Sequence, residues 1–302
     1  MLLLLSSLLI VLLIPHEAHA WGAGFHLQLG VSVLNNLQSI NPAIASILSA
    51  YPNDFLYGCI AADITIGKKF THYLQHCHRW AIGLNILQHA ESRRQEACAY
   101  GYLAHLAADT IAHNYFVPYK VMRSFPTLTL KHTYWEMRFE SFVDKEIWEI
   151  GKKVSMEHYK INDALLRKLV SETIFSFNTN KRIFNSILLL SRLEKWQKVL
   201  KTHADSSRHV LEIEDRIEYA TLAEEAVLDL LKGVEQSLYF KADPTGERAL
   251  VTAESVRKNL RLLYKSGKIT KPQAMEQLEE MKGKLRNAIC TPDLLLEILS
   301  TE

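Results

Sequence analysis

The chain has 302 residues, of which 48% are hydrophobic and 23% charged, and its formal net charge at pH 7 is +2. This near balance disfavours a nonspecific nucleic-acid-binding protein, because such proteins normally carry a clearly basic face. Four cysteines are too few for a disulfide framework in a chain of this length. The length fits one large domain or two modest ones.

The first twenty residues have the pattern of a secretory signal peptide. Residues 2–14 are almost wholly apolar, and they are followed by Ala18-His19-Ala20, a small-residue cleavage site. The apolar run is shorter than the roughly 20 residues of a membrane-spanning helix. No Lys or Arg precedes it, so an uncleaved N-terminal anchor is the alternative. We expect cleavage after Ala20, a mature chain that begins at Trp21, and a secreted or periplasmic protein.

Helical spacing dominates the remainder of the chain. Phe25, Leu29, Val33 and Leu37 recur on one helix face, and Asn41-Pro42 is a typical helix start. Further helices are predicted over residues 96–116 and 127–148, and Asp243-Pro244-Thr245-Gly246 predicts a turn. No run alternates as a strand would. We therefore predict an all-α, multi-helix bundle with a catalytic core over 21–150 and a helical region over 151–302 that completes or caps it.

Residues of the kinds that bind zinc gather within about a hundred positions of the N-terminal half. The candidates are His26, Asp63, His76, His78, His105, Asp109, His113, His132 and Glu136. Imidazole nitrogen and carboxylate oxygen are ligands that Zn²⁺ prefers.

Two groups of these candidates have helical spacing. His105, Asp109 and His113 share a face of one predicted helix, and His132 and Glu136 lie one turn apart on another. Such groups on facing helices could hold several metal ions, which activate water and clamp the oxygens of a phosphate ester. In the alternative interpretation, the pairs are ordinary i,i+4 contacts, the histidines at 76 and 78 are loop residues, and Trp21 is a core aromatic.

The order of these residues resembles the zinc-dependent phospholipase C family, which is related to the single-strand-specific nucleases of the S1/P1 type. Mature chains of that group begin with Trp, as in Trp21-Gly22-Ala23-Gly24-Phe25-His26. Asp63 and His78 fit the Asp and His that follow, with His76 as a near alternative. His105 and Asp109 match the family's HxxxD motif, and His132 and Glu136 match its HxxxE/D motif. Glu in the last position is the phospholipase form, whereas the nucleases carry Asp there.

The resemblance covers roughly residues 21–145 and implies up to three zinc ions. The first would be held by Asp63, His78, His105 and Asp109, and the second by His113, His132 and Glu136. The third would be held by the amino nitrogen and carbonyl oxygen of Trp21, by His26 and by a bridging Asp109. His113 lies four residues after Asp109, where the best-known members have a spacing of six.

By this resemblance, we expect an exported zinc-dependent phosphodiesterase that hydrolyses phospholipids with a metal-bound hydroxide. Asp63 would be the catalytic residue that orients or deprotonates the water. Phospholipid or another phosphodiester would be the substrate, with contact to a membrane surface and no stable nucleic-acid complex. One alternative is a single-strand nuclease or nucleotidase of the S1/P1 type. The other is a metal-stabilised envelope protein that binds a partner without catalysis.

Overall fold

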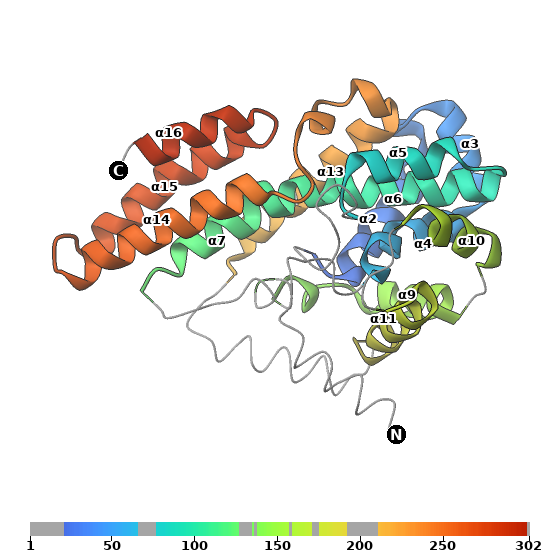
Figure 1. Cartoon of the computed structure of the whole chain (residues 1–302), viewed down its shortest axis with the longest axis horizontal. Coiled ribbons are helices and arrows are strands. Elements are labelled where there is room, and N and C mark those ends of the chain that lie inside the picture. Colours follow the sequence, from blue (N-terminus) through green and yellow to red (C-terminus); the bar gives the residue numbers. More distant parts are fainter. Residues whose placement is uncertain are drawn as a thin grey trace.

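The computed structural model describes residues 21–65, 77–126, 135, 138–156, 159–170, 175–191 and 211–300. Every regular element in these ranges is helical and none is a strand, which confirms the predicted all-α class (Figure 1). The α-helices are α2 (Ala23–Asn35), α3 (Pro42–Ala50), α4 (Pro52–Ala61), α5 (Trp80–Gln88), α6 (Arg93–Ile111), α7 (Val117–Arg123), α9 (Lys145–Met156), α10 (Lys160–Leu169), α11 (Phe177–Ser191), α13 (Ile213–Lys232), α14 (Glu247–Lys265), α15 (Lys271–Ala288) and α16 (Leu295–Ser300). The short turns of helix are η1 (Leu37–Ser39), η2 (Ala62–Ile64), η5 (Ala112–Phe116), η6 (Val234–Gln236), η7 (Leu238–Lys241) and η8 (Pro292–Leu294).

The predicted helix at Phe25 and the predicted helix start at Asn41 are confirmed, but Leu37, expected on the first helix, lies in η1 beyond the end of α2. The face of α2 that carries Phe25, Leu29 and Val33 is buried, as its spacing predicts. Asn41 caps α3, because its side chain accepts a hydrogen bond of 2.9 Å from the backbone N–H of Ala43. Helices α2 and α3 therefore form where the sequence predicts them, and α2 packs on the core through its predicted face.

Helix α6 is the centre of the core and is buried along almost its whole length. It packs against α4, α5 and α13 (Figure 1). Two glycines bring the backbones of α4 and α6 into direct contact. A Cβ added to Gly58 would lie 2.0 Å from the carbonyl oxygen of Cys98, and one added to Gly101 would lie 2.1 Å from that of Phe55. Only residues without a side chain allow these helices to approach so closely.

The helix predicted over 96–116 does not continue unchanged to its end. α6 ends at Ile111, and the π-helical turn η5 leads into α7. Pro118 supplies a reason, because proline has no N–H to donate to the carbonyl four residues earlier. The N–H of Val117 instead bonds to the carbonyl of Ala112, five residues back. The register of the helix therefore changes within the turn that carries His113.

The helix predicted over 127–148 is interrupted. Residues 138–140 are helical, residues 141–143 form a turn, and α9 begins at Lys145. Asp144 precedes α9, at a position where Asp is favoured because it can cap the helix. Residues 127–134, 136 and 137 lie outside the described part of the chain.

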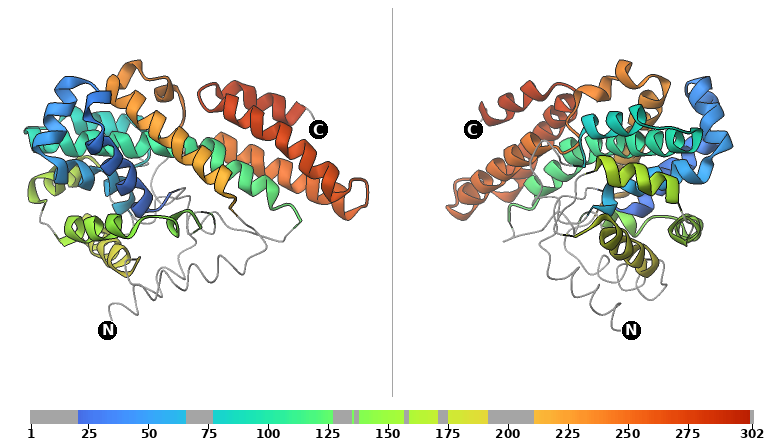
Figure 2. Two further views of the ribbon diagram at one scale, coloured as in Figure 1. Left: turned by 180° about the vertical axis from the view of Figure 1, so that it is seen from behind. Right: turned by 45° about the vertical axis from the view of Figure 1, so that its right-hand side comes forward.

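The C-terminal helices pack directly on the N-terminal half. α14 and α15 lie along α7, and α13 crosses α6 and α2 (Figures 1 and 2). A charged cluster joins these elements: Lys120 of α7 is fully buried and pairs with Asp215 of α13, while Lys282 of α15 lies 2.8 Å from both Asp215 and Glu218. Among the described helices, none has the length and apolar character required to cross a bilayer.

Candidate metal centre

Asp109 of α6 lies at the centre of a cluster of histidines. Its Oδ2 is 3.1 Å from Nε2 of His105, 3.3 Å from Nε2 of His78 and 3.9 Å from Nε2 of His113. Its Oδ1 is 3.4 Å from Nε2 of His26. All five side chains are buried. One carboxylate is thus shared by four imidazoles, and its two oxygens face different histidines.

The other described carboxylate of the cluster is Asp63 in η2, which follows α4. Its Oδ1 lies 3.2 Å from Nε2 of His78 and 3.9 Å from Nε2 of His105. His78 lies two residues before the start of α5, and its Nε2 is 3.1 Å from Nε2 of His105. Three segments distant in sequence therefore meet at one point.

The tautomer of neutral His105 is set by its contact with α4. Nδ1 of His105 lies 2.9 Å from the carbonyl oxygen of Cys59. A carbonyl oxygen only accepts, so Nδ1 carries the hydrogen and donates it. In the neutral ring Nε2 is then unprotonated, with its lone pair directed at Asp109. This is the usual arrangement of a metal-binding histidine and its supporting hydrogen bond.

His26 of α2 has the environment of a ligand rather than of a satisfied core residue. Its ring stacks on that of His105, with centroids 3.7 Å apart and planes inclined by 18°. It is 2% exposed, and neither of its ring nitrogens forms a hydrogen bond among the described residues. Oδ1 of Asp109 is buried and likewise lacks a hydrogen bond, because its 3.4 Å contact with Nε2 of His26 does not have hydrogen-bond geometry. Buried polar atoms left in this state are costly unless they bind something else, such as a metal ion.

Burial and neighbouring charges shift the pKa values of the clustered residues in opposite directions. Burial alone would raise the pKa of Asp109, but His105, His26 and His113 hold that pKa well below its usual range. Burial and the neighbouring His105 lower the pKa of His26. For His105, burial acts to lower the pKa, yet Asp109 and Asp63 raise it above its usual value. An ionised Asp109 and a neutral His26 are the forms that bind zinc.

Two triads of these residues have the geometry of a metal site. They are His26, Asp63 and His105, and His78, His105 and Asp109; within each triad, the three ligand atoms lie within 4.8 Å of one another. The donors are nitrogen and oxygen, which suits Zn²⁺. The residues of the cluster therefore fit the metal that the sequence predicts.

The structure brings together six of the predicted ligands: His26, Asp63, His78, His105, Asp109 and His113. His76, His132 and Glu136 lie outside the described residues, as does the rest of the segments 66–76 and 127–134. His78 lies beside Asp63, as the resemblance implies. The distribution of the ligands over three ions stays a prediction.

The side chain of Trp21 belongs to the core. It is fully buried, and its indole Nε1 donates a hydrogen bond of 3.2 Å to the carbonyl oxygen of Ala108. The indole stacks on Phe116 of η5 and meets Phe139 edge-on. These contacts hold Trp21 beside the helix that carries Asp109. The role of its amino nitrogen and carbonyl oxygen as zinc ligands stays a prediction.

One residue beside the centre has no sequence signal that marks it. The carboxylate of Glu140 accepts hydrogen bonds from the backbone N–H groups of Gly24, at 3.2 Å, and Phe25, at 2.9 Å, in the first turn of α2. Burial raises its pKa to about 7. Among the many acidic residues of the chain, only the tertiary contact distinguishes this one.

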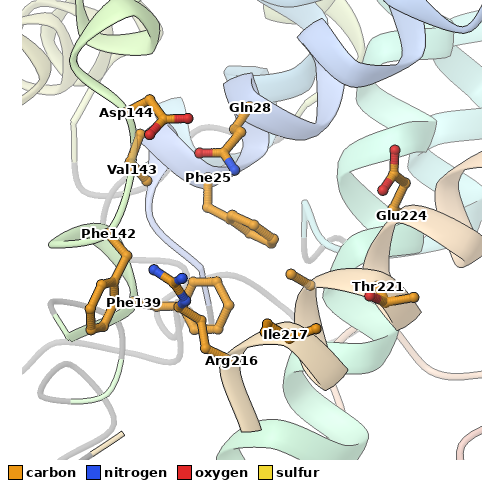
Figure 3. A pocket seen from close by; sticks show the side chains of 11 residues that line it. Phe25, Gln28, Phe139, Phe142, Val143, Asp144, Arg216, Ile217, Thr221 and Glu224 are labelled. Carbon is orange, nitrogen blue, oxygen red and sulfur yellow. The ribbon is translucent and has the colours of Figure 1, made fainter. Parts of the chain in front are cut away.

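A surface pocket of about 290 Å³ lies between α2, the segment 139–144 and α13 (Figure 3). The rings of Phe25, Phe139 and Phe142 line it, together with the charged side chains of Arg216 and Glu224. The guanidinium of Arg216 lies 4.5 Å from the centre of the Phe142 ring. Phe25 precedes His26 and Phe139 packs on Trp21, so the pocket borders residues that surround the metal cluster.

Comparison with known protein families gives a match over a large part of the chain. Residues 25–184, more than half of the chain, match the family described as zinc dependent phospholipase C. Neither the curated proteins nor the solved structures contain a significant match. The family match spans all six clustered ligands. The resemblance read from the ligand order is thus confirmed: the chain belongs to the zinc-dependent phospholipase C family.

Proposed function

We propose that the protein is an exported zinc enzyme that hydrolyses phospholipids at the phosphodiester bond on the diacylglycerol side. Family membership supports a zinc-dependent phosphodiester hydrolase. The observation that carries the proposal is the position of Asp109, whose carboxylate lies within 3.9 Å of the Nε2 atoms of four buried histidines. Ordinary core packing gives no reason to gather four imidazoles around one acid.

Zinc, when bound, acts as a Lewis acid that makes a coordinated water more acidic and neutralises charge on phosphoryl oxygens. His26, Asp63, His78, His105, Asp109 and His113 would hold it. Asp109 suits a carboxylate shared between ions, since its two oxygens face different histidines. The contact between His105 and the Cys59 carbonyl keeps Nε2 available as a ligand.

In the proposed reaction, Asp63 orients the attacking water and accepts its proton. The water oxygen forms a bond to phosphorus, and the bond from phosphorus to the glycerol oxygen breaks. That oxygen takes up a proton from solvent and Asp63 returns its proton to solvent, so the products are diacylglycerol and the phosphorylated head group. Asp63 is suited to the role, because it lies at the edge of the cluster and 3.2 Å from His78.

The mixed lining of the pocket supports a lipid substrate. Three phenylalanine rings offer apolar contact, while Arg216 and Glu224 offer charge to a polar head. Ligand sites of this kind combine an apolar lining with a few polar groups (Figure 3). The proposal places the glycerol and acyl portions of the substrate here.

The test is side-by-side hydrolysis by zinc-loaded protein that begins at Trp21. We expect the wild-type protein to release diacylglycerol from phosphatidylcholine micelles, and we expect the Asp63→Asn variant to lose this activity. Release of nucleotides from single-stranded DNA, without release of diacylglycerol from the lipid, would contradict the phospholipase proposal. It would support the nuclease alternative, which the Trp-Gly-Ala-x-x-His start favours. Stoichiometric zinc with neither activity would favour the non-catalytic binding protein.

A further inference from the structure

A turn from outside the family-matched residues packs directly on one of the clustered histidines. Gly246 has φ +58°, in the left-handed region that glycine favours. A Cβ added to it would lie 2.3 Å from the carbonyl oxygen of His113, and 2.5 Å from both the carbonyl carbon and the Cβ of His113. Gly246 therefore touches the backbone of His113 with no room for a side chain.

A second contact joins the same turn to the next residue. The side-chain amide of Asn114 donates hydrogen bonds to the carbonyl oxygens of Thr110, at 2.8 Å, and Asp243, at 2.7 Å. Asp243 in turn stabilises its own turn, since its carboxylate accepts hydrogen bonds from the backbone N–H of Thr245, at 3.0 Å, and from its hydroxyl, at 2.7 Å. The turn and η5 are thus tied at two adjacent positions.

These contacts are made to η5, whose π-helical geometry is unfavourable in an isolated helix. π-Helical turns are rare and persist where surrounding structure stabilises them. His113 lies inside η5, and its 3.9 Å distance to Oδ2 of Asp109 is the longest of the four histidine distances. Return of this turn to α-helical geometry would rotate His113 relative to Asp109.

We propose that the Asp243–Gly246 turn is a positioning element that holds η5 in π-helical form and so keeps His113 directed at the metal centre. The proposal rests on the zinc site of the proposed function. It gives the region beyond residue 184 a defined part in the site: none of its described residues belongs to the cluster, but its turn sets the position of one clustered histidine.

Gly246→Ala tests the proposal, and the chain offers a matched control. Gly267 also has a left-handed φ of +73°, but a Cβ added there meets nothing within 4 Å. Both substitutions impose the backbone strain of a positive φ, and only Gly246→Ala presses on His113. Zinc affinity would be measured by competition with a chromophoric chelator. We expect at least one zinc to bind tenfold or more weakly in Gly246→Ala, and wild-type affinity within about twofold in Gly267→Ala. Equal affinities in the two variants would overturn the proposal.

A milder pair of variants keeps the test decisive if Gly246→Ala does not fold. Asp243→Ala loosens the turn without adding an atom near His113, whereas Thr270→Ala removes a comparable local cap at the start of α15. The absorption spectrum of the Co²⁺-substituted protein then reports ligand geometry directly. A changed spectrum and weaker zinc binding in Asp243→Ala alone would support the proposal, and identical behaviour of the two variants would refute it. Absence of zinc binding in the wild-type protein would instead refute the proposed function.

Discussion

Replacement of Asp109 by Asn tests the metal centre most directly, because it keeps the size of the side chain and removes its charge. Loss of a residue that only supports a ligand costs roughly 10- to 100-fold in metal affinity. Asp109 faces four histidines through both of its oxygens, so its loss is expected to cost at least about 100-fold, or roughly 2.7 kcal/mol. More than one ion is expected to be lost, since the proposed function has this carboxylate shared between two ions.

The same loss sets the expected change in stability. At free zinc 100 times the dissociation constant, binding stabilises the wild-type fold by about 2.7 kcal/mol, and a 100-fold weaker site leaves only about 0.4 kcal/mol. The difference corresponds to roughly 5 °C in Tm for a chain of this size. Calorimetry with zinc and with a chelator would measure it, together with metal content after dialysis.

Asp54→Asn is the matched control for this prediction. Asp54 is as deeply buried as Asp109, but it pairs with Arg94 and Asn162 outside the cluster. Its replacement should lower stability equally with and without zinc and leave the zinc content unchanged. If Asp109→Asn retained as much zinc as Asp54→Asn, the ligand assignment would be wrong.

Three further predictions follow from other parts of the structure. Extra residues ahead of Trp21 should reduce the zinc content by one ion, because the free amine is lost; unchanged content would exclude the terminal ligand. Glu140→Gln should flatten the pH dependence of the free energy of unfolding. In the wild-type protein, the stabilisation due to protonated Glu140 is present below pH about 4.5 and is lost, by up to about 3 kcal/mol, as the pH rises to about 7. The reason is that this carboxyl ionises at a lower pH in the unfolded chain than in the folded one. Urea titrations from pH 4.5 to 8 would measure this slope, and parallel curves for the two proteins would contradict it. Phe142→Ala should raise the KM for phosphatidylcholine micelles roughly three- to tenfold with kcat nearly unchanged, because apolar contact with the substrate is lost. Leu262→Ala, which removes an exposed side chain of α14, should leave the KM unchanged. An equal effect of the two variants would remove the pocket from the substrate site.

The central part of the cluster was predictable because a helix repeats its geometry. His105 and Asp109 lie one turn apart, and this spacing alone places them on one face of α6. The start of α3 was equally predictable, because the signal is local: Asn41 caps the helix that Pro42 begins. The all-α class follows from the same kind of short-range pattern.

Other parts of the site depend on contacts that no spacing encodes. The π-helical turn at His113 reflects both Pro118 and a turn more than a hundred residues later. The interruption at residues 141–143 was missed because the apolar spacing continues through it. Glu140 is recognisable only once α2 has been placed against it. For the π-helical turn and for Glu140, part of the explanation is a partner distant in sequence.

The glycine contact between α4 and α6 has a consequence for how active members of this family are recognised. Gly58 and Gly101 let the two backbones touch, and this approach sets the Cys59 carbonyl against His105 and brings Asp63 within its reach. A homologue with alanine at either position would retain every ligand in an alignment, yet its helices would be forced apart. Surveys of genomes that count ligands alone would score such a chain as functional. The two glycines belong among the diagnostic positions.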